Sequence, residues 1–129
     1  MMTVMKRILL KGLAGRAVNS LNGFRAAVKG EWALRADLVV FAIAVVVACA
    51  MPGLSWGERA VMIHSAFTPV LAELANTAIE KTVDRISLER HPLSGQAKDI
   101  GSALVFAAFV GAGICWFVIL VGWAVRTFG

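Results

Sequence analysis

Four polar residues share a segment of the chain and have the residue types and spacing that chemistry requires: Glu73, Asn76, Glu80 and Asp84. In an α-helix, residues three or four apart lie on the same face, so these four side chains are expected to form one stripe. Carboxylates one or two turns apart can bind Mg²⁺, which prefers oxygen ligands and usually keeps phosphate oxygens in its shell. A carboxylate in apolar surroundings can also act as a general base. The stripe therefore predicts an acidic, metal-capable site.

Two further charges belong to this prediction. Lys98 follows the Ser94-Gly95 pair and would bring positive charge to phosphate groups, and Glu31 directly precedes an apolar segment, where it is expected at the same membrane surface. The sequence has neither a Walker motif nor the glycine loop of protein kinases. The residues alone thus predict an acidic site at a membrane surface without specifying ATP.

An alternative interpretation places part of the stripe in water. In that case Glu80 and Asp84 would belong to a solvated face and pair with nearby cations such as Lys81 or Lys98. Glu73 is harder to explain in this way because mostly apolar residues precede it. Ionisable groups at membrane depth are costly and mark functional sites by default.

The composition identifies lipid as the solvent of the elements that carry these residues. Hydrophobic residues make up 59% of the 129 residues and charged residues 16%, against about 45–50% and about 25% in soluble domains. The mean hydropathy is +0.77. One domain of this length cannot hide so much apolar surface from water. The two cysteines lie inside apolar runs and are expected to be packing residues.

The apolar pattern predicts an all-α membrane protein with a single membrane domain over 1–129. Three predicted transmembrane helices cover 33–51, 59–88 and 100–125, the second of them extending into the cytoplasm. Pro69 is acceptable as a kink within the second span. Before the spans, residues 6–30 predict an amphipathic helix lying on the membrane surface, with an apolar face that includes Leu10, Leu13 and Leu21.

The distribution of charge predicts orientation. Seven of the 13 Lys and Arg residues lie at or before the start of the first span, and four more lie around the connection between the second and third spans. The positive-inside rule then places the N-terminus and this connection in the cytoplasm and the C-terminus outside. The basic excess is therefore a topological and lipid-facing feature, and nucleic acid is not expected as a partner.

Two segments resemble the prokaryotic diacylglycerol kinase family. The first is Glu73–Ile86, with the pattern E-x-x-N-[ST]-A-I-E-x-x-V-D, and the second is His91–Ala103, which contains a Lys-Asp pair. Gly23-Phe24-Arg25 and Glu31 match as well, so the resemblance extends from residue 23 to the C-terminus. The resemblance implies a lipid kinase of the bacterial inner membrane that serves phospholipid biosynthesis. It implies a homotrimeric bundle of three-span subunits with active sites shared between subunits.

The resemblance also implies a reaction and residue roles. The γ-phosphoryl group of MgATP would pass to the primary hydroxyl of diacylglycerol and give phosphatidic acid at the cytoplasmic surface. Glu73 would be the general base, and Glu31 and Glu80 would bind the metal ion. The nucleotide would be bound by Asn76, Asp84, Glu89, His91, Ser94, Gly95, Lys98 and Asp99.

Two other functions remain open from the sequence. Undecaprenol kinases belong to the same family and use a polyisoprenol acceptor in place of diacylglycerol. A protein of another class, a non-enzymatic proton or cation pathway, would arise if oligomerisation brought several carboxylate stripes together. Such a pathway needs polar residues through the whole bilayer, and the third span offers only Ser102 near one end.

Overall fold

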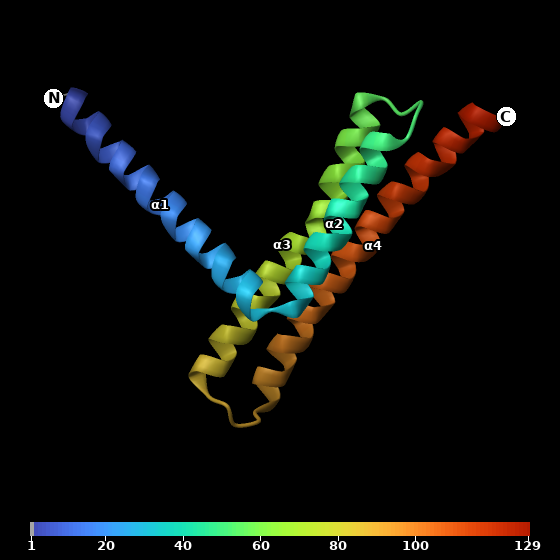
Figure 1. The fold of residues 1–129 in the computed structure, drawn as a ribbon. Coiled ribbons are helices and arrows are strands. Elements are labelled where there is room, and N and C mark those ends of the chain that lie inside the picture. The colour runs from blue at the N-terminus through green and yellow to red at the C-terminus, as the bar shows by residue number, and fades with distance from the viewer. Residues whose placement is uncertain (1) are drawn as a thin grey trace. The chain divides into compact units, whose positions relative to one another are not determined.

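The computed structural model describes residues 2–129, with side chains described from residue 13 onward. The described chain is all-helical, with α1 Met2–Gly30, α2 Trp32–Ala50, α3 Trp56–Ile86 and α4 Pro92–Phe128 (Figure 1). It divides into two compact units, Met1–Trp32 and Ala33–Gly129. The predicted all-α class is confirmed.

Two helices, α2 and α4, are long and apolar enough to cross a membrane by length and composition. The polar stripe keeps α3 out of this group, so its membrane span stays a prediction. In the first unit, α1 includes the predicted segment 6–30 as one helix. Leu13 and Leu21 are exposed on it, whereas the side chain of Leu10 lies outside the described residues. The surface location of α1 also stays a prediction.

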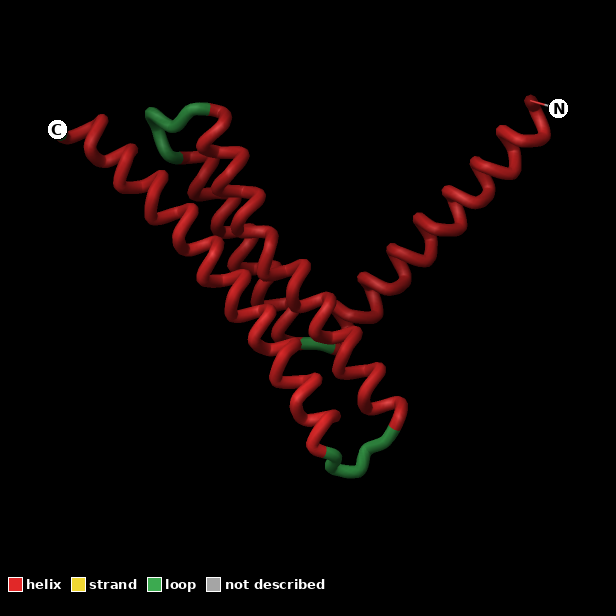
Figure 2. The backbone as a smooth tube through the Cα atoms, turned by 180° about the vertical axis from the view of Figure 1, so that it is seen from behind, coloured by secondary structure: helices red, strands yellow, loops and turns green. Residues whose placement is uncertain are grey.

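In the second unit, α2, α3 and α4 run side by side and alternate in direction, with short loops between them (Figures 1 and 2). The turn between α2 and α3 depends on Gly53, whose φ of 77° lies in the left-handed region. Ser55 then starts α3 with a capping box: its hydroxyl accepts from the Glu58 N–H at 3.2 Å, and its own N–H donates to the Glu58 carboxylate at 2.8 Å.

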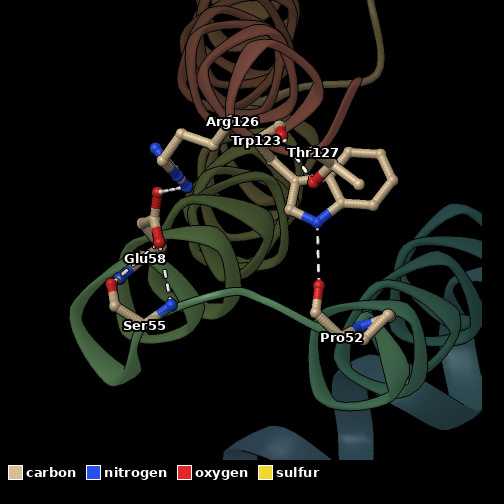
Figure 3. Close-up of polar contacts among 6 residues, drawn as sticks. All are labelled: Pro52, Ser55, Glu58, Trp123, Arg126 and Thr127. Atoms are coloured by element: carbon tan, nitrogen blue, oxygen red, sulfur yellow. Dashed lines mark hydrogen bonds and ion pairs between the residues drawn. The ribbon is translucent and has the colours of Figure 1, made fainter. Parts of the chain in front are cut away.

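The three helices are joined at this end by polar contacts around an apolar cluster. Ala48, Leu54 and Met62 form the buried cluster. The Trp123 indole donates to the Pro52 carbonyl at 2.8 Å, which ties α4 to the α2–α3 turn (Figure 3). Arg126 near the end of α4 pairs with Glu58 at 2.5 Å (Figure 3). The α2–α3 turn and the C-terminal end of α4 are thereby held together.

Pro69 lies inside α3 without interrupting it. A proline has no N–H, so the carbonyl four residues earlier, that of Ser65, loses its helical partner. The Thr68 hydroxyl donates to this carbonyl at 2.7 Å, and Ser65 is buried. A side-chain hydrogen bond thus replaces the missing backbone bond, as membrane depth would require.

At the other end, α3 and α4 extend beyond the start of α2 as a two-helix hairpin (Figures 1 and 2). The His91 ring caps α4, its Nδ1 atom accepting from the Leu93 N–H at 3.2 Å, and Pro92 takes the first helical position. The helix therefore starts well before the predicted span of 100–125. Its first turns carry Ser94, Lys98 and Asp99, which places these polar residues on a rigid element.

Candidate active site

The polar stripe of α3 passes from buried to exposed along the helix. Glu73 is 8% exposed and Asn76 is 6% exposed, whereas Glu80 is half-buried and Asp84 is exposed. The four residues therefore lie on one helix, as the spacing predicts. A carboxylate buried to this extent is unusual, which makes Glu73 the feature of the stripe that most needs a functional explanation.

Asn76 connects the buried and the half-buried parts of the stripe. Its Nδ2 atom donates to Oε1 of Glu80 at 3.2 Å. Its Oδ1 atom is buried and has no hydrogen-bond partner. The amide therefore orients the Glu80 carboxylate, because the hydrogen bond restricts where that oxygen can lie.

A cleft opens at the projecting end of the α3–α4 hairpin. Its volume is about 500 Å³, within the range of roughly 300–1,000 Å³ typical of small-molecule sites. Six of the eight residues predicted to bind nucleotide line it: Asp84, Glu89, His91, Ser94, Gly95 and Lys98. The loop between the helices thus brings together residues from the end of α3 and the start of α4.

One cation of the cleft, Lys98, is held by a carboxylate. Lys98 donates to Asp84 at 2.6 Å, across from α4 to α3. This hydrogen bond raises the pKa of Lys98, which lies before the predicted span of 100–125. Lys98 therefore keeps its positive charge at neutral pH in the cleft.

The cap of α4 leaves one ring atom of His91 for other contacts. Nδ1 is engaged by the Leu93 N–H, so a nucleotide contact of His91 would use Nε2. The start of a long helix also favours negative charge, because the positive end of its dipole lies there. The helix dipole and Lys98 thus both contribute positive charge on the α4 side of the cleft.

Four predicted site residues of the second unit lie outside the lining of this cleft, among them Glu73 and Glu80. Asn76 and Asp99 do not line it either, and Asp99 is exposed on α4. Glu31 belongs to the first unit, Met1–Trp32. In the part of the chain that the structure describes, no group of three or more His, Cys, Asp or Glu side chains is arranged to bind a metal ion.

The donor set nevertheless suits a hard cation. The described stripe offers carboxylate oxygens, which Mg²⁺ prefers, and the two free cysteines lie on α2 and α4 outside it. The half-buried Glu80, oriented by Asn76, offers a carboxylate to such an ion.

Sequence reasoning missed two residues here. Arg90 lines the cleft beside the predicted residues, and only the loop conformation shows this. Gly101 is the buried residue of α4, and it lies against Asn76. The signal for Gly101 was present in the sequence, since a glycine three residues after Lys98 faces the same side of the helix as the site.

These features define a class: an α-helical membrane-type protein whose polar helix face runs from a buried carboxylate to a cleft lined by charged residues. The model of the prokaryotic diacylglycerol kinase family matches residues 18–120. The diacylglycerol kinase of Pseudomonas aeruginosa is 45% identical over 113 residues, 88% of this chain and 91% of its own length. That of Escherichia coli K12 is 43% identical over 101 residues, 78% and 82% of the two chains.

The chain belongs to the prokaryotic diacylglycerol kinase family. The predicted resemblance is therefore confirmed, and so is the predicted enzyme class, a lipid kinase.

Proposed function

We propose that this protein phosphorylates diacylglycerol, transferring the γ-phosphoryl group of ATP to the primary hydroxyl of the lipid and releasing phosphatidic acid and ADP. The observation that carries the proposal is the change in burial along one helix face, from buried Glu73 to Asp84 in the polar cleft. A lipid hydroxyl held at membrane depth by its acyl chains can reach the buried end. The charged nucleotide can occupy the exposed end.

Each of these residues is assigned one role in phosphoryl transfer, which depends mostly on positioning and charge neutralisation. Glu73 accepts the proton of the lipid hydroxyl as that oxygen attacks phosphorus. Lys98, held by Asp84, neutralises phosphate charge. Glu80 and Glu31 would hold Mg²⁺, and Asn76 orients the Glu80 carboxylate. When bound, the ion would supply charge stabilisation to the phosphate oxygens.

The remaining nucleotide contacts are assigned to the cleft and its border. Ser94 and Gly95 lie in the first turn of α4, where the positive end of the helix dipole favours phosphate. Glu89 and His91 line the loop side of the cleft and are assigned to the ribose and base. Asp99 is assigned to the border of the site.

We further propose that the enzyme is a homotrimer of the bacterial inner membrane with active sites shared between subunits. Large apolar side chains of α2 and α4 such as Val46 and Phe106 are exposed, at 66% and 71%, and need lipid or a second copy as a cover. The basic N-terminal segment and the α3–α4 loop are placed in the cytoplasm, and the C-terminus outside. The nucleotide cleft then faces cytoplasmic ATP.

Phosphate transfer from γ-labelled MgATP to diacylglycerol in mixed micelles tests the function. We expect activity in the wild type and a fall in kcat of about 10²–10⁴-fold in Glu73→Gln, the usual contribution of a general base. The half-saturating ATP concentration should stay close to the wild-type value. Glu58→Gln is the matched control, because it makes the same chemical change near the start of α3, away from the stripe.

The other outcomes separate the alternatives. Equal losses of ATP affinity and kcat in Glu73→Gln would contradict the assignment of the base. Transfer to undecaprenol without transfer to diacylglycerol would identify the other acceptor. Ion flux through vesicles without any lipid phosphorylation would identify a cation pathway.

A further inference from the structure

Helices α3 and α4 approach each other closely at Asn76 and Gly101. Gly101 is buried although it lies in the largely exposed helix α4. A Cβ atom built at Gly101 would overlap Oδ1 of Asn76 and would contact the Ile79 side chain at 3.7 Å. The Asn76 carboxamide therefore occupies the space that any larger residue at 101 would need.

The orientation of this carboxamide is determined by its two ends. The NH₂ end donates to Glu80, and the carbonyl end is buried without a hydrogen-bond partner and faces Gly101. Exchanging the two ends would set a carbonyl oxygen against a carboxylate oxygen. Gly101 thus leaves room for the carbonyl end of the Asn76 amide, while the NH₂ end of the same amide points to Glu80.

The remaining glycines of α4 provide an internal comparison. A Cβ atom at Gly95, Gly111 or Gly113 would meet no atom within 4 Å, and one at Gly122 would meet an Arg126 nitrogen at 3.4 Å. Glycine weakens a helix by about 1 kcal/mol relative to alanine. At Gly101, unlike these other positions, the Asn76 side chain leaves no room for a Cβ atom, which explains a glycine there in spite of its weaker helix propensity.

We propose that Gly101 is a positioning residue of the phosphoryl-transfer site: its missing side chain lets the Asn76 carboxamide lie between α3 and α4 with its NH₂ group on Glu80. The proposal rests on the proposed function, in which Glu80 binds the metal ion. A methyl group at 101 would force the carboxamide to rotate or the helices to separate. Rotation breaks the Asn76–Glu80 hydrogen bond, and separation of the helices removes the contact at Gly101 that holds the carboxamide in place. In both cases the Glu80 carboxylate is less restrained.

The first test observes the amide itself. The chain has only three asparagines and one glutamine, so the side-chain NH₂ signals of ¹⁵N-labelled protein in detergent micelles are few, and the Asn76→Ala variant identifies the signal of Asn76. We expect Gly101→Ala to shift this signal and the control Gly111→Ala to leave it in place. An unchanged Asn76 signal in folded Gly101→Ala would overturn the proposal.

The second test measures the metal requirement. Loss of a hydrogen bond to a charged group corresponds to roughly tenfold in an equilibrium constant. Gly101→Ala should therefore raise the half-saturating Mg²⁺ concentration about tenfold, whereas Gly111→Ala should not change it. A fall in kcat with an unchanged Mg²⁺ requirement would overturn the proposal in favour of a purely structural role for the glycine.

A third measurement covers the case in which Gly101→Ala folds poorly. The change should lower Tm when residue 76 is Asn and should raise or preserve it when residue 76 is Ala, because the clash is then absent and alanine favours the helix. Equal losses of Tm in both backgrounds would overturn the proposal. If the wild type is inactive on lipids while the amide shift and the Tm reversal occur, the placement of Asn76 stands and the proposed function fails.

Discussion

Arg59 is expected to contribute strongly to the stability of the α2–α3 turn. The last carbonyls of a helix have no partners within the helix. The Arg59 guanidinium donates to those of Cys49 at 2.6 Å and Met51 at 2.7 Å, and to that of the fully buried Ala48. Its positive charge also lies at the negative end of the α2 dipole. One side chain thus caps α2 from the first turn of the next helix.

The size of the effect can be worked out from these contacts. A hydrogen bond to a charged group contributes about 1.5–3 kcal/mol. Arg59 is half-buried and water can replace it at the exposed Cys49, so the sum of three such bonds is an upper limit. We expect Arg59→Met to lower the free energy of unfolding by about 2–4 kcal/mol. Arg59→Lys keeps the charge but not the three-way geometry, and should lose about 1–2 kcal/mol.

The assay is unfolding of purified protein in mixed micelles titrated with sodium dodecyl sulfate and followed by circular dichroism. Arg85→Met is the control, since it removes an exposed cation near the end of α3. Lipid kinase activity of Arg59→Met at a temperature where it is folded should match the wild type. An unfolding free energy within about 0.5 kcal/mol of the wild type would refute the capping role, because that is the range of ordinary surface substitutions.

Two further predictions concern side-chain hydrogen bonds elsewhere in α3. Thr68→Val should lower the free energy of unfolding by about 1–3 kcal/mol, because it leaves the buried Ser65 carbonyl without a donor. The control Thr82→Val removes a hydrogen bond of the same 2.7 Å length where no proline follows, and it should lower the free energy of unfolding by less. Equal losses in the two variants would contradict this account of Pro69. The Ser55 N–H, the Ser55 hydroxyl and Arg126 lower the pKa of Glu58 from 4.5 to about 2. The wild type should therefore be more stable than Glu58→Gln above pH 4.5. It should lose that advantage as the pH falls toward 2, because the native carboxylate must then take up a proton. A stability difference that stays constant over this pH interval in detergent unfolding would contradict the lowered pKa of Glu58.

Much of the candidate site could be predicted from the sequence because its chemistry lies on one helix. The period of an α-helix places Glu73, Asn76, Glu80 and Asp84 on one face whatever the rest of the chain does. The all-α class follows from composition in the same way, and the family follows from the length of the matching pattern. The sequence predicts a membrane span in α3 less clearly than in α2 and α4, because the polar residues of the site also interrupt the apolar pattern of α3.

Contacts between helices required the tertiary structure. The pairing of Lys98 with Asp84 joins residues 14 apart across a loop, and sequence alone allows Lys98 other carboxylates. The overlap of Gly101 with Asn76 depends on the distance between α3 and α4, and the capping of α2 by Arg59 depends on how the turn at Gly53 folds back. Local periodicity decides which residues share a helix face, but side-chain packing and loop geometry decide which faces meet.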